Sequence, residues 1–480
     1  MSSSHSFLKN ILLRLFLTIP VRFRNFIILP LLTRMYTQEI YGAWLQVLLL
    51  AEILRQLLSL RFGTALVRYL SVEDDPRDMI KGILAITFIM SICLILISLL
   101  YGGFISWLFW GTPDFKSILL VVSMWMMAQA LKTVELNALR ARERIGMLSV
   151  WEIVSSVWLI SSVVLSYILR LELEKLILVC IIGDFIVCIL IALQLKIVNL
   201  SFSLKKTLFM MKKFLPYSAP LILNSIFLWF TQSIDRILIV QFLGLSSVAI
   251  YGVAMQVAQL LSVVLGPINY VLFPRVSNSW NENMKDDVSK YFSQAFVLTL
   301  VFSTPIIVGV FVVSDGLISL FAGEIYASNN MVILFLLLSV FFSMIYQNHL
   351  YVIHLKEKTY LLPVLFVVTA FINYGLSYIM ILRMGILGGA CAHFVTFLMM
   401  AVIVTIWARK YIIFSVPWVI VFKVALVSIA MGISIAWMPL DNWLQLLFAV
   451  IIGTVVYFLL LFIFRVLTFE KLAAIKRQVI

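Results

Sequence analysis

The sequence has little charge: Asp, Glu, Lys and Arg make up only 12% of its 480 residues, whereas 63% are hydrophobic. A soluble globular domain is about 45–50% apolar, so this composition excludes one. A bilayer core of about 30 Å takes about 20 apolar helical residues per crossing. Apolar runs recur from end to end with short polar breaks, which leaves no room for a soluble domain. The sequence therefore predicts an all-α, polytopic membrane protein.

Signals for metal binding and covalent chemistry are also scarce. The four cysteines lie in apolar runs without metal-ligand spacing, and the four histidines are scattered. Glycine-rich phosphate loops, serine-triad elbows and cysteine-nucleophile contexts are absent. The N-terminus lacks the compact apolar region and cleavage site of a signal peptide. We therefore expect no catalytic residue, no metal, no cofactor and a first helix that is retained.

Hydropathy predicts about fourteen transmembrane helices, and the charge distribution predicts their orientation. The predicted spans lie near residues 7–31, 41–64, 82–108, 116–138, 147–169, 174–195, 214–243, 247–272, 288–314, 330–353, 359–382, 385–408, 414–438 and 443–464. Most Lys and Arg residues fall in the connections on the side that holds both termini. The positive-inside rule places that side in the cytoplasm. The net charge of +14 is thus an orientation signal and not a sign of nucleic-acid binding.

A short internal repeat divides the chain. The motif Tyr-Gly-x-x-x-Gln-Val opens the second predicted helix at Tyr41 and the eighth at Tyr251. Six helices separate the copies, so the two halves have the same orientation, as in a parallel repeat with the substrate path between the halves. We expect two six-helix lobes around a central cavity plus two appended helices. The predicted boundaries are an N-terminal lobe 1–198, a basic cytoplasmic linker 199–213, a C-terminal lobe 214–410, and appended helices with a cytoplasmic tail 411–480.

Asp235 and Arg236 lie in the middle of an apolar run. An ionised side chain near the bilayer centre costs about 2.5–3.5 kcal/mol, so such residues usually mark a transport path. Asn224, Gln232 and Asp235 fall within a helical stripe of about 80°, and Arg236 lies just beyond it. Two interpretations stay open. Either Asp235 and Arg236 form a self-neutralising structural pair, or Arg236 binds an anionic group such as phosphate while Asp235 orients it or takes a coupling cation.

The first two predicted helices also carry buried arginines. Arg22 and Arg24 lie in the first helix, and Arg24 precedes its Tyr-Gly repeat by about as many residues as Arg236 does. We therefore expect Arg24 and Arg236 to face each other across the cavity. Glu52 and Arg55 lie on one polar face of the second helix, with the i,i+3 spacing of an ion pair.

Asp184 is a lone carboxylate at mid-depth in the sixth predicted helix. It is a candidate carrier of a coupling H⁺ or Na⁺, and Asp235 is the other. A structural hydrogen bond from Asp184 to a neighbouring helix is an equally acceptable interpretation.

Several motifs, taken together in order and spacing, resemble the bacterial polysaccharide flippases of the O-antigen type. They are Ile28–Arg34 followed by Glu39–Gly42, Asp235–Ile239 with Leu243-Gly244 and Ile250–Gly252, Phe273–Arg275, Phe321–Ala327 and Gly385–Ala390. The resemblance spans essentially the whole chain. Such flippases belong to the multidrug/oligosaccharidyl-lipid/polysaccharide exporter superfamily.

The resemblance implies two lobes, alternating access and no enzymatic activity. It implies that the substrate is an undecaprenyl-diphosphate-linked oligosaccharide, moved from the cytoplasmic to the periplasmic leaflet of the inner membrane for O-antigen or related polysaccharide synthesis. Arg24 and Arg236, and after them Arg22 and Arg55, match positions where cationic residues would meet the diphosphate. The expected partners are membrane lipids, the polysaccharide polymerase and the chain-length machinery. Lipid II flippases share this architecture.

Two other functions compete with this one. A drug/cation antiporter of the same superfamily should have an acidic cavity, whereas the predicted spans hold more basic than acidic residues. A membrane-embedded polysaccharide polymerase or ligase should have a sizeable periplasmic loop with basic groups. The longest outward connection, near residues 315–329, has no basic residue. Both comparisons favour an anionic substrate that is moved without covalent chemistry.

Overall fold

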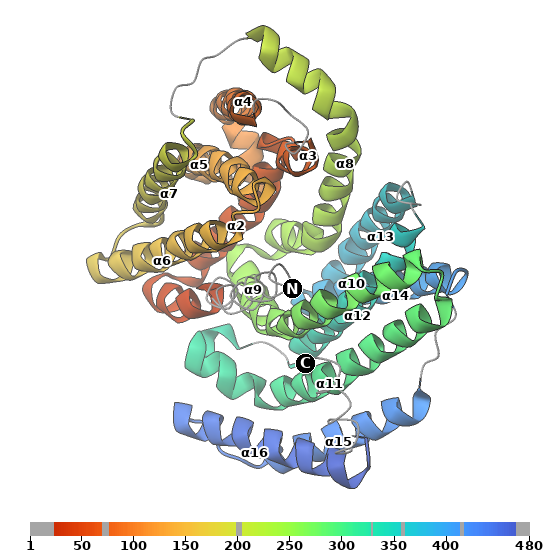
Figure 1. Ribbon diagram of the computed structural model, residues 1–480. Helices are drawn as coiled ribbons and strands as arrows, with labels where there is room; N and C mark the ends of the chain where they lie inside the picture. The colour runs from red at the N-terminus through yellow and green to blue at the C-terminus, as the bar shows by residue number, and fades with distance from the viewer. Residues whose placement is uncertain are drawn as a thin grey trace. The chain divides into compact units, whose positions relative to one another are not determined.

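The computed structural model describes residues 24–69, 76–197, 204–327, 330–356, 361–412 and 417–466. In these ranges the chain forms α-helices, short 3-10 helices and turns, and no strand (Figure 1). The predicted all-α class is therefore confirmed.

The chain divides into two compact units, Met1–Ala249 and Ile250–Ile480. The first described helix of this unit, residues 24–35, overlaps the end of the first predicted span, 7–31. Its further elements are α2 (Gln38–Leu58), α3 (Phe62–Tyr69), α4 (Pro76–Trp110), η2 (Pro113–Phe115), α5 (Lys116–Ala141), α6 (Ile145–Leu169), α7 (Leu173–Leu195) and α8 (Leu204–Leu243). Helix α9 (Leu245–Gln259) crosses the boundary between the units.

The second unit contains the remaining helices. They are η3 (Leu260–Val264), α10 (Leu265–Asn281), α11 (Lys285–Phe321), η4 (Glu324–Tyr326), α12 (Asn330–Leu355), α13 (Leu361–Met384), α14 (Ile386–Arg409), α15 (Trp418–Ala436) and α16 (Trp443–Ile463). Within this unit α15 and α16 pack on α11. The predicted division into lobes stays a prediction, although residues 204–213 of the predicted linker are helical and open α8.

Thirteen helices within the described ranges are long and apolar enough to cross a membrane. The chain is thus a multi-pass membrane protein. Most of the first predicted span, residues 7–31, lies outside the described residues, so the total of fourteen stays a prediction. The predicted span 247–272 is not continuous, because α9 passes into η3 before α10 begins. Pro267 lacks the amide N–H that a continuous helix would need at this point.

Helix α2 is anchored to its neighbours through its backbone. The indole N–H of Trp110 on α4 donates to the carbonyl of Ala43 at 3.2 Å. The indole N–H of Trp229 on α8 donates to the carbonyl of Leu49 at 3.1 Å. An indole N–H usually finds such a partner when it is buried. The two bonds hold α2 between α4 and α8.

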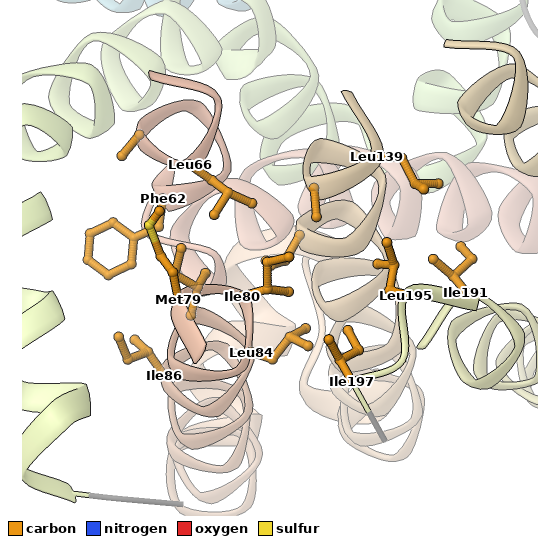
Figure 2. Close-up of a cluster of buried hydrophobic side chains, with 14 of the residues drawn as sticks. Phe62, Leu66, Met79, Ile80, Leu84, Ile86, Leu139, Ile191, Leu195 and Ile197 are labelled. Atoms are coloured by element: carbon orange, nitrogen blue, oxygen red, sulfur yellow. The ribbon is translucent and has the colours of Figure 1, made fainter. Parts of the chain in front are cut away.

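A buried apolar cluster packs the ends of several helices in the first unit (Figure 2). Side chains from α3 and α4 meet those from α5 and from the C-terminal end of α7. Its buried members include Phe62, Leu66, Met79, Ile80, Ile83, Leu84, Ala138, Leu139, Ile191, Leu195, Ile197 and Phe214. Close packing of this kind fixes the relative positions of the helices. It therefore holds α5 and α7 together at one end of their shared interface.

In the second unit, Gly388 lets the start of α14 touch α13. A Cβ at Gly388 would lie 2.0 Å from the carbonyl oxygen of Met380 and 2.3 Å from its carbon, so Gly388→Ala must push the helices apart. We expect this change to cost about 1–3 kcal/mol, a typical cost of overpacking. The measurement is the thermal unfolding midpoint of the purified protein in detergent, which should fall by several degrees.

Gly375 provides the matched control on α13. A Cβ at Gly375 would meet no atom within 4 Å. Alanine there should leave the midpoint unchanged or raise it, because glycine in a helix interior is about 1 kcal/mol less favourable than alanine. Equal midpoints for Gly388→Ala and Gly375→Ala would contradict the close contact.

Candidate functional site

The polar face of α8 follows the i,i+4 spacing. Asn224, Gln232 and Arg236 are all half-buried, whereas Asp235 is 0% exposed. Burial thus groups Arg236 with Asn224 and Gln232, whereas Asp235 is packed against neighbouring residues, and the role of each residue stays a prediction. The physical reason is that side chains on a helix surface form ridges along the i±4 rows, which wind slowly around the axis. A fixed angular window misses a residue on such a ridge.

The Arg236 guanidinium lies back along its own helix. Its Nη2 donates to the carbonyl of Gln232 at 3.0 Å and to Ser233 Oγ at 3.5 Å. The carbonyl of Arg236 in turn accepts a bond from Nε2 of Gln46, the glutamine of the Tyr-Gly repeat, at 3.3 Å. Within the described residues, no acidic side chain forms an ion pair with Arg236. Its positive charge is thus held in place without being neutralised by a carboxylate.

Arg24 lies among charged groups from three other helices of the first unit. It interacts electrostatically with Arg55 on α2, with Asp184 on α7 and with Glu152 on α6. The two arginines repel each other, and an anion placed between them would relieve that repulsion. Arg22 lies outside the described residues. Arg24 and Arg236 both fall in the unit Met1–Ala249, and the expectation that they face each other stays a prediction.

Glu52 and Arg55 share a face of α2, but the expected ion pair is not formed. Glu52 is exposed and Arg55 is half-buried, and no ion pair joins them in the described part of the chain. The side chain of Gln56 instead donates to the carbonyl of Glu52 at 3.4 Å. Surface ion pairs gain little against the rotamer freedom that they cost, which explains the open arrangement. Glu52 therefore does not neutralise Arg55, whose charge acts on Arg24.

Asp184 has three partners, all on α5. It forms an ion pair with Lys132, and it accepts hydrogen bonds from Nε1 of Trp125 at 2.7 Å and from Nε2 of Gln129 at 2.6 Å. Asp184 is 4% exposed and Lys132 5%. Of the two interpretations of Asp184, a structural hydrogen bond to a neighbouring helix is present in the structure. Its role as a carrier of a coupling ion stays a proposal.

Sequence reasoning missed Lys132, which lies near the end of the predicted span 116–138. The signal was nevertheless present, because Trp125, Gln129 and Lys132 follow the i,i+4,i+7 spacing of one helix face. It also missed Glu135, which lies one turn further along α5 and is buried. On α7, Gly183 permits close packing against α6, since a Cβ there would lie 1.9 Å from the Trp158 ring.

Three arginines of the first unit suit the binding of an anion. No group of three or more His, Cys, Asp or Glu side chains in the described ranges is arranged to hold a metal ion. Half-buried Arg24, Arg55 and Arg236 instead bring three guanidinium groups to membrane-embedded helices of one unit. A guanidinium fork binds two phosphate oxygens at once.

The comparison with protein families decides the relationship. The family model for polysaccharide biosynthesis proteins matches residues 31–331, which is more than half of the chain. The chain belongs to this family. No curated protein sequence matches this polysaccharide biosynthesis protein.

Solved structures show the same fold at low identity. The lipid II flippase MurJ, in an inward closed conformation, is 18% identical with a TM-score of 0.79, and the match covers 94% of this chain and 98% of that chain. An inward-facing multidrug resistance MATE transporter of the MOP superfamily is 14% identical with a TM-score of 0.64, covering 82% and 97%. A MOP superfamily transporter from Pyrococcus furiosus, described as having a binding pocket of reverse polarity, is 14% identical with a TM-score of 0.52, covering 83% and 93%.

Family and fold together confirm the relationship that the sequence motifs predicted. This polysaccharide biosynthesis protein has the fold of the MOP superfamily.

The stripe on α8 can be tested by thiol labelling. In a chain whose four cysteines are replaced by alanine, we expect Asn224→Cys and Gln232→Cys to react with a hydrophilic maleimide, because both positions are half-buried beside Arg236. Ser233→Cys is the control, since Ser233 is 0% exposed. The measurement is the initial labelling rate in membranes. Equal labelling rates at positions 232 and 233 would contradict the expectation that water reaches the stripe more readily than the packed face.

Proposed function

We propose that this polysaccharide biosynthesis protein is a flippase for an undecaprenyl-diphosphate-linked oligosaccharide. It moves the saccharide from the cytoplasmic to the periplasmic leaflet of the inner membrane by alternating access, for O-antigen or a related surface polysaccharide. The polyprenyl tail stays in lipid, so only the diphosphate and the sugars cross the membrane interior.

The observation that carries this proposal is the set of arginines in the first unit. Ionised side chains on spanning helices are costly and usually face a protein interior or a wet cavity. Arg24 and Arg55 interact electrostatically, and Arg236 is held by its own helix without a carboxylate partner in the described residues. A diphosphate would supply negative charge to Arg55 and Arg236, which form no ion pair with a carboxylate in the described residues. The family, which takes its name from polysaccharide biosynthesis, supports the same substrate class.

The proposal includes orientation and partners. Both termini are placed in the cytoplasm by the positive-inside rule. Exposed Arg77, Arg140, Arg144 and Lys196, at helix ends of the first unit, support this orientation. The polysaccharide polymerase and the chain-length machinery are the expected partners, because they consume the flipped intermediate.

The test is deletion of the gene followed by analysis of the lipids that accumulate. We expect loss of one surface polysaccharide in viable cells, with its complete undecaprenyl-diphosphate-linked repeat unit retained on the cytoplasmic leaflet. Restoring the gene should clear the intermediate. A repeat unit that reaches the periplasmic leaflet at the normal rate in the deletion strain would refute the proposal.

Lipid II is the second candidate substrate. The fold similarity to MurJ over 94% of this chain favours it. Lipid II is also a polyprenyl-diphosphate saccharide, so the arginine site suits both. The two differ in outcome, because loss of a lipid II flippase stops cell-wall synthesis and lyses cells. Depletion of the protein with osmotic stability followed over several generations separates them.

A further inference from the structure

Three arginines meet at one end of the first unit, where α4 begins and α5 passes into α6. Arg77 lies in the first turn of α4, Arg142 directly follows α5, and Arg144 directly precedes α6. Arg142 is half-buried, whereas Arg77 and Arg144 are exposed. Burial, and after it the charges of Arg144 and Arg77, lower the pKa of Arg142. The ionised form of this arginine cluster (Arg77, Arg142 and Arg144) is therefore unfavourable unless an anion lies close to it.

The α5–α6 connection does not supply that anion. Arg142 and Arg144 form no ion pair with a carboxylate in the part of the chain that the structure describes. Glu143 stands between them in sequence, but its side chain is exposed and pairs with neither arginine. The Nη1 of Arg144 instead contacts the sulfur of Met147 at 4.0 Å. An anion from outside the chain would offset the repulsion among these like charges.

The backbone holds the arginines of this connection in fixed positions. The N–H of Arg142 donates to the carbonyl of Ala138 at 3.1 Å, and the N–H of Arg144 donates to the carbonyl of Leu139 at 3.0 Å. Next to the arginines in sequence are Met79 and Leu139, two buried members of the apolar cluster in Figure 2. Groups that are already fixed lose little further freedom when they bind a ligand. The cluster is thus prepared for an anion.

An exposed apolar face of α6 continues from the arginine cluster. Met147, Val150, Val154 and Val157 are exposed and follow the spacing of one helix face. Helix α6 is long and apolar enough to cross a membrane, so this face contacts acyl chains. A soluble anion would use the guanidinium groups alone. A phospholipid would use both features, with its phosphate at the arginines and an acyl chain along α6.

The positive-inside rule does not by itself explain this arrangement. That rule requires cations near the membrane surface, but it does not require them to lie close together or to be partly buried. Lys410, which is exposed at the end of α14, has the isolated position that the rule accounts for. The proximity of Arg77, Arg142 and Arg144 therefore needs a further reason.

We propose that Arg77, Arg142 and Arg144 form a binding site for the phosphate headgroup of an anionic phospholipid. A guanidinium fork binds two phosphate oxygens at once. Basic groups between spanning helices are suited to acidic headgroups. The site uses none of the arginines of the proposed diphosphate site, and it does not depend on which saccharide is moved. A lipid bound there joins the ends of α4, α5 and α6 and stabilises the first unit.

The test measures the lipid affinity of the full-length protein, purified in a neutral detergent and stripped of lipid. The probe is phosphatidylglycerol, and phosphatidylcholine with the same acyl chains and inorganic phosphate are the comparison ligands. We expect phosphatidylglycerol to bind at least about tenfold more tightly than either. It should also raise the unfolding midpoint, because a ligand that binds the folded state stabilises it. Arg142→Ala and Arg144→Ala should each weaken its binding about fivefold, the usual contribution of one basic side chain near an anionic surface.

Two variants control for general effects of charge. Lys410→Ala removes an exposed cation from the same predicted side of the membrane, and it should change the dissociation constant less than about twofold. Glu143→Gln removes a negative charge from the α5–α6 connection itself, and it should leave binding unchanged or make it tighter. If Arg142→Ala does not fold, Arg144→Gln provides the same test, since Arg144 is exposed.

Three results would overturn the inference. Equal affinities for phosphatidylglycerol and phosphatidylcholine would exclude a headgroup site. Inorganic phosphate that binds as tightly as phosphatidylglycerol would make the ligand a soluble anion. Equal losses in Lys410→Ala and Arg144→Ala would reduce the arginine cluster to a general surface charge. The proposed flippase function is tested separately, because these measurements involve no transport.

Discussion

Replacing Arg24 or Arg236 with alanine is expected to abolish surface polysaccharide while leaving the protein in the membrane. Each change removes one guanidinium group from the proposed diphosphate site. A hydrogen bond to a charged group contributes about 1.5–3 kcal/mol, so each variant should lose about tenfold to a hundredfold in transport. Arg236 bonds its own helix and not a neighbouring one through its side chain, so its loss should not disrupt packing. The measurements are polymer on the cell surface and protein in the membrane fraction.

Lysine substitutions and a distant arginine provide the controls. Arg24→Lys and Arg236→Lys keep the charge but lose the planar fork, so they should restore transport only in part. Arg383→Ala removes an exposed arginine near the end of α13 and should have no effect. Normal polymer in both alanine variants would remove these arginines from the site.

Asp184→Asn is expected to destabilise the first unit by about 3–5 kcal/mol, the usual cost of breaking a buried ion pair from one side. The asparagine carbonyl can still accept hydrogen bonds from Trp125 and Gln129. The loss of stability therefore reports the effect of the removed negative charge. Lys132, at 5% exposure, is left without its carboxylate partner on α7. The measurement is the unfolding midpoint in detergent or the yield of folded protein.

A double variant tests whether stability returns when both charges of the Lys132–Asp184 pair are removed. Lys132→Met with Asp184→Asn removes both charges and keeps a long side chain in place of lysine. It should recover most of the stability that Asp184→Asn loses, because a buried pair contributes little beyond the neutral alternative. Additive losses in the double variant would mean that the two residues do not act as a pair.

Composition and hydropathy were sufficient to predict the helical class and most of the spans. Long apolar runs in lipid have to be helical, because every backbone polar group must be satisfied internally. The break between α9 and α10 was not predicted, since a window average over 247–272 hides the single proline that interrupts it. The motif pattern also predicted the family, because glycines and prolines at helix boundaries reflect the backbone that the fold requires.

The site was predicted less completely than the fold. Arg24, Arg55 and Arg236 could be selected because charges inside apolar runs are conspicuous. Asp235 is fully buried and Arg236 is half-buried, a difference that a helical wheel cannot predict because it does not show which neighbouring helices cover the stripe. Lys132 was missed because a lysine near the end of a predicted span looks like an orientation signal. Lys132 is buried because it forms an ion pair with Asp184 on α7, and the sequence alone does not show that these two helices are in contact.

The two indole bonds to α2 restrict how this helix can vary in length. The acceptor carbonyls of Ala43 and Leu49 stand six positions apart, each facing a different neighbouring helix. An inserted or deleted residue between them would turn one carbonyl by about 100° relative to the other. One tryptophan would then lose its acceptor inside the membrane. Homologous chains that keep both tryptophans should therefore show no gap in this segment, whatever changes occur in its side chains.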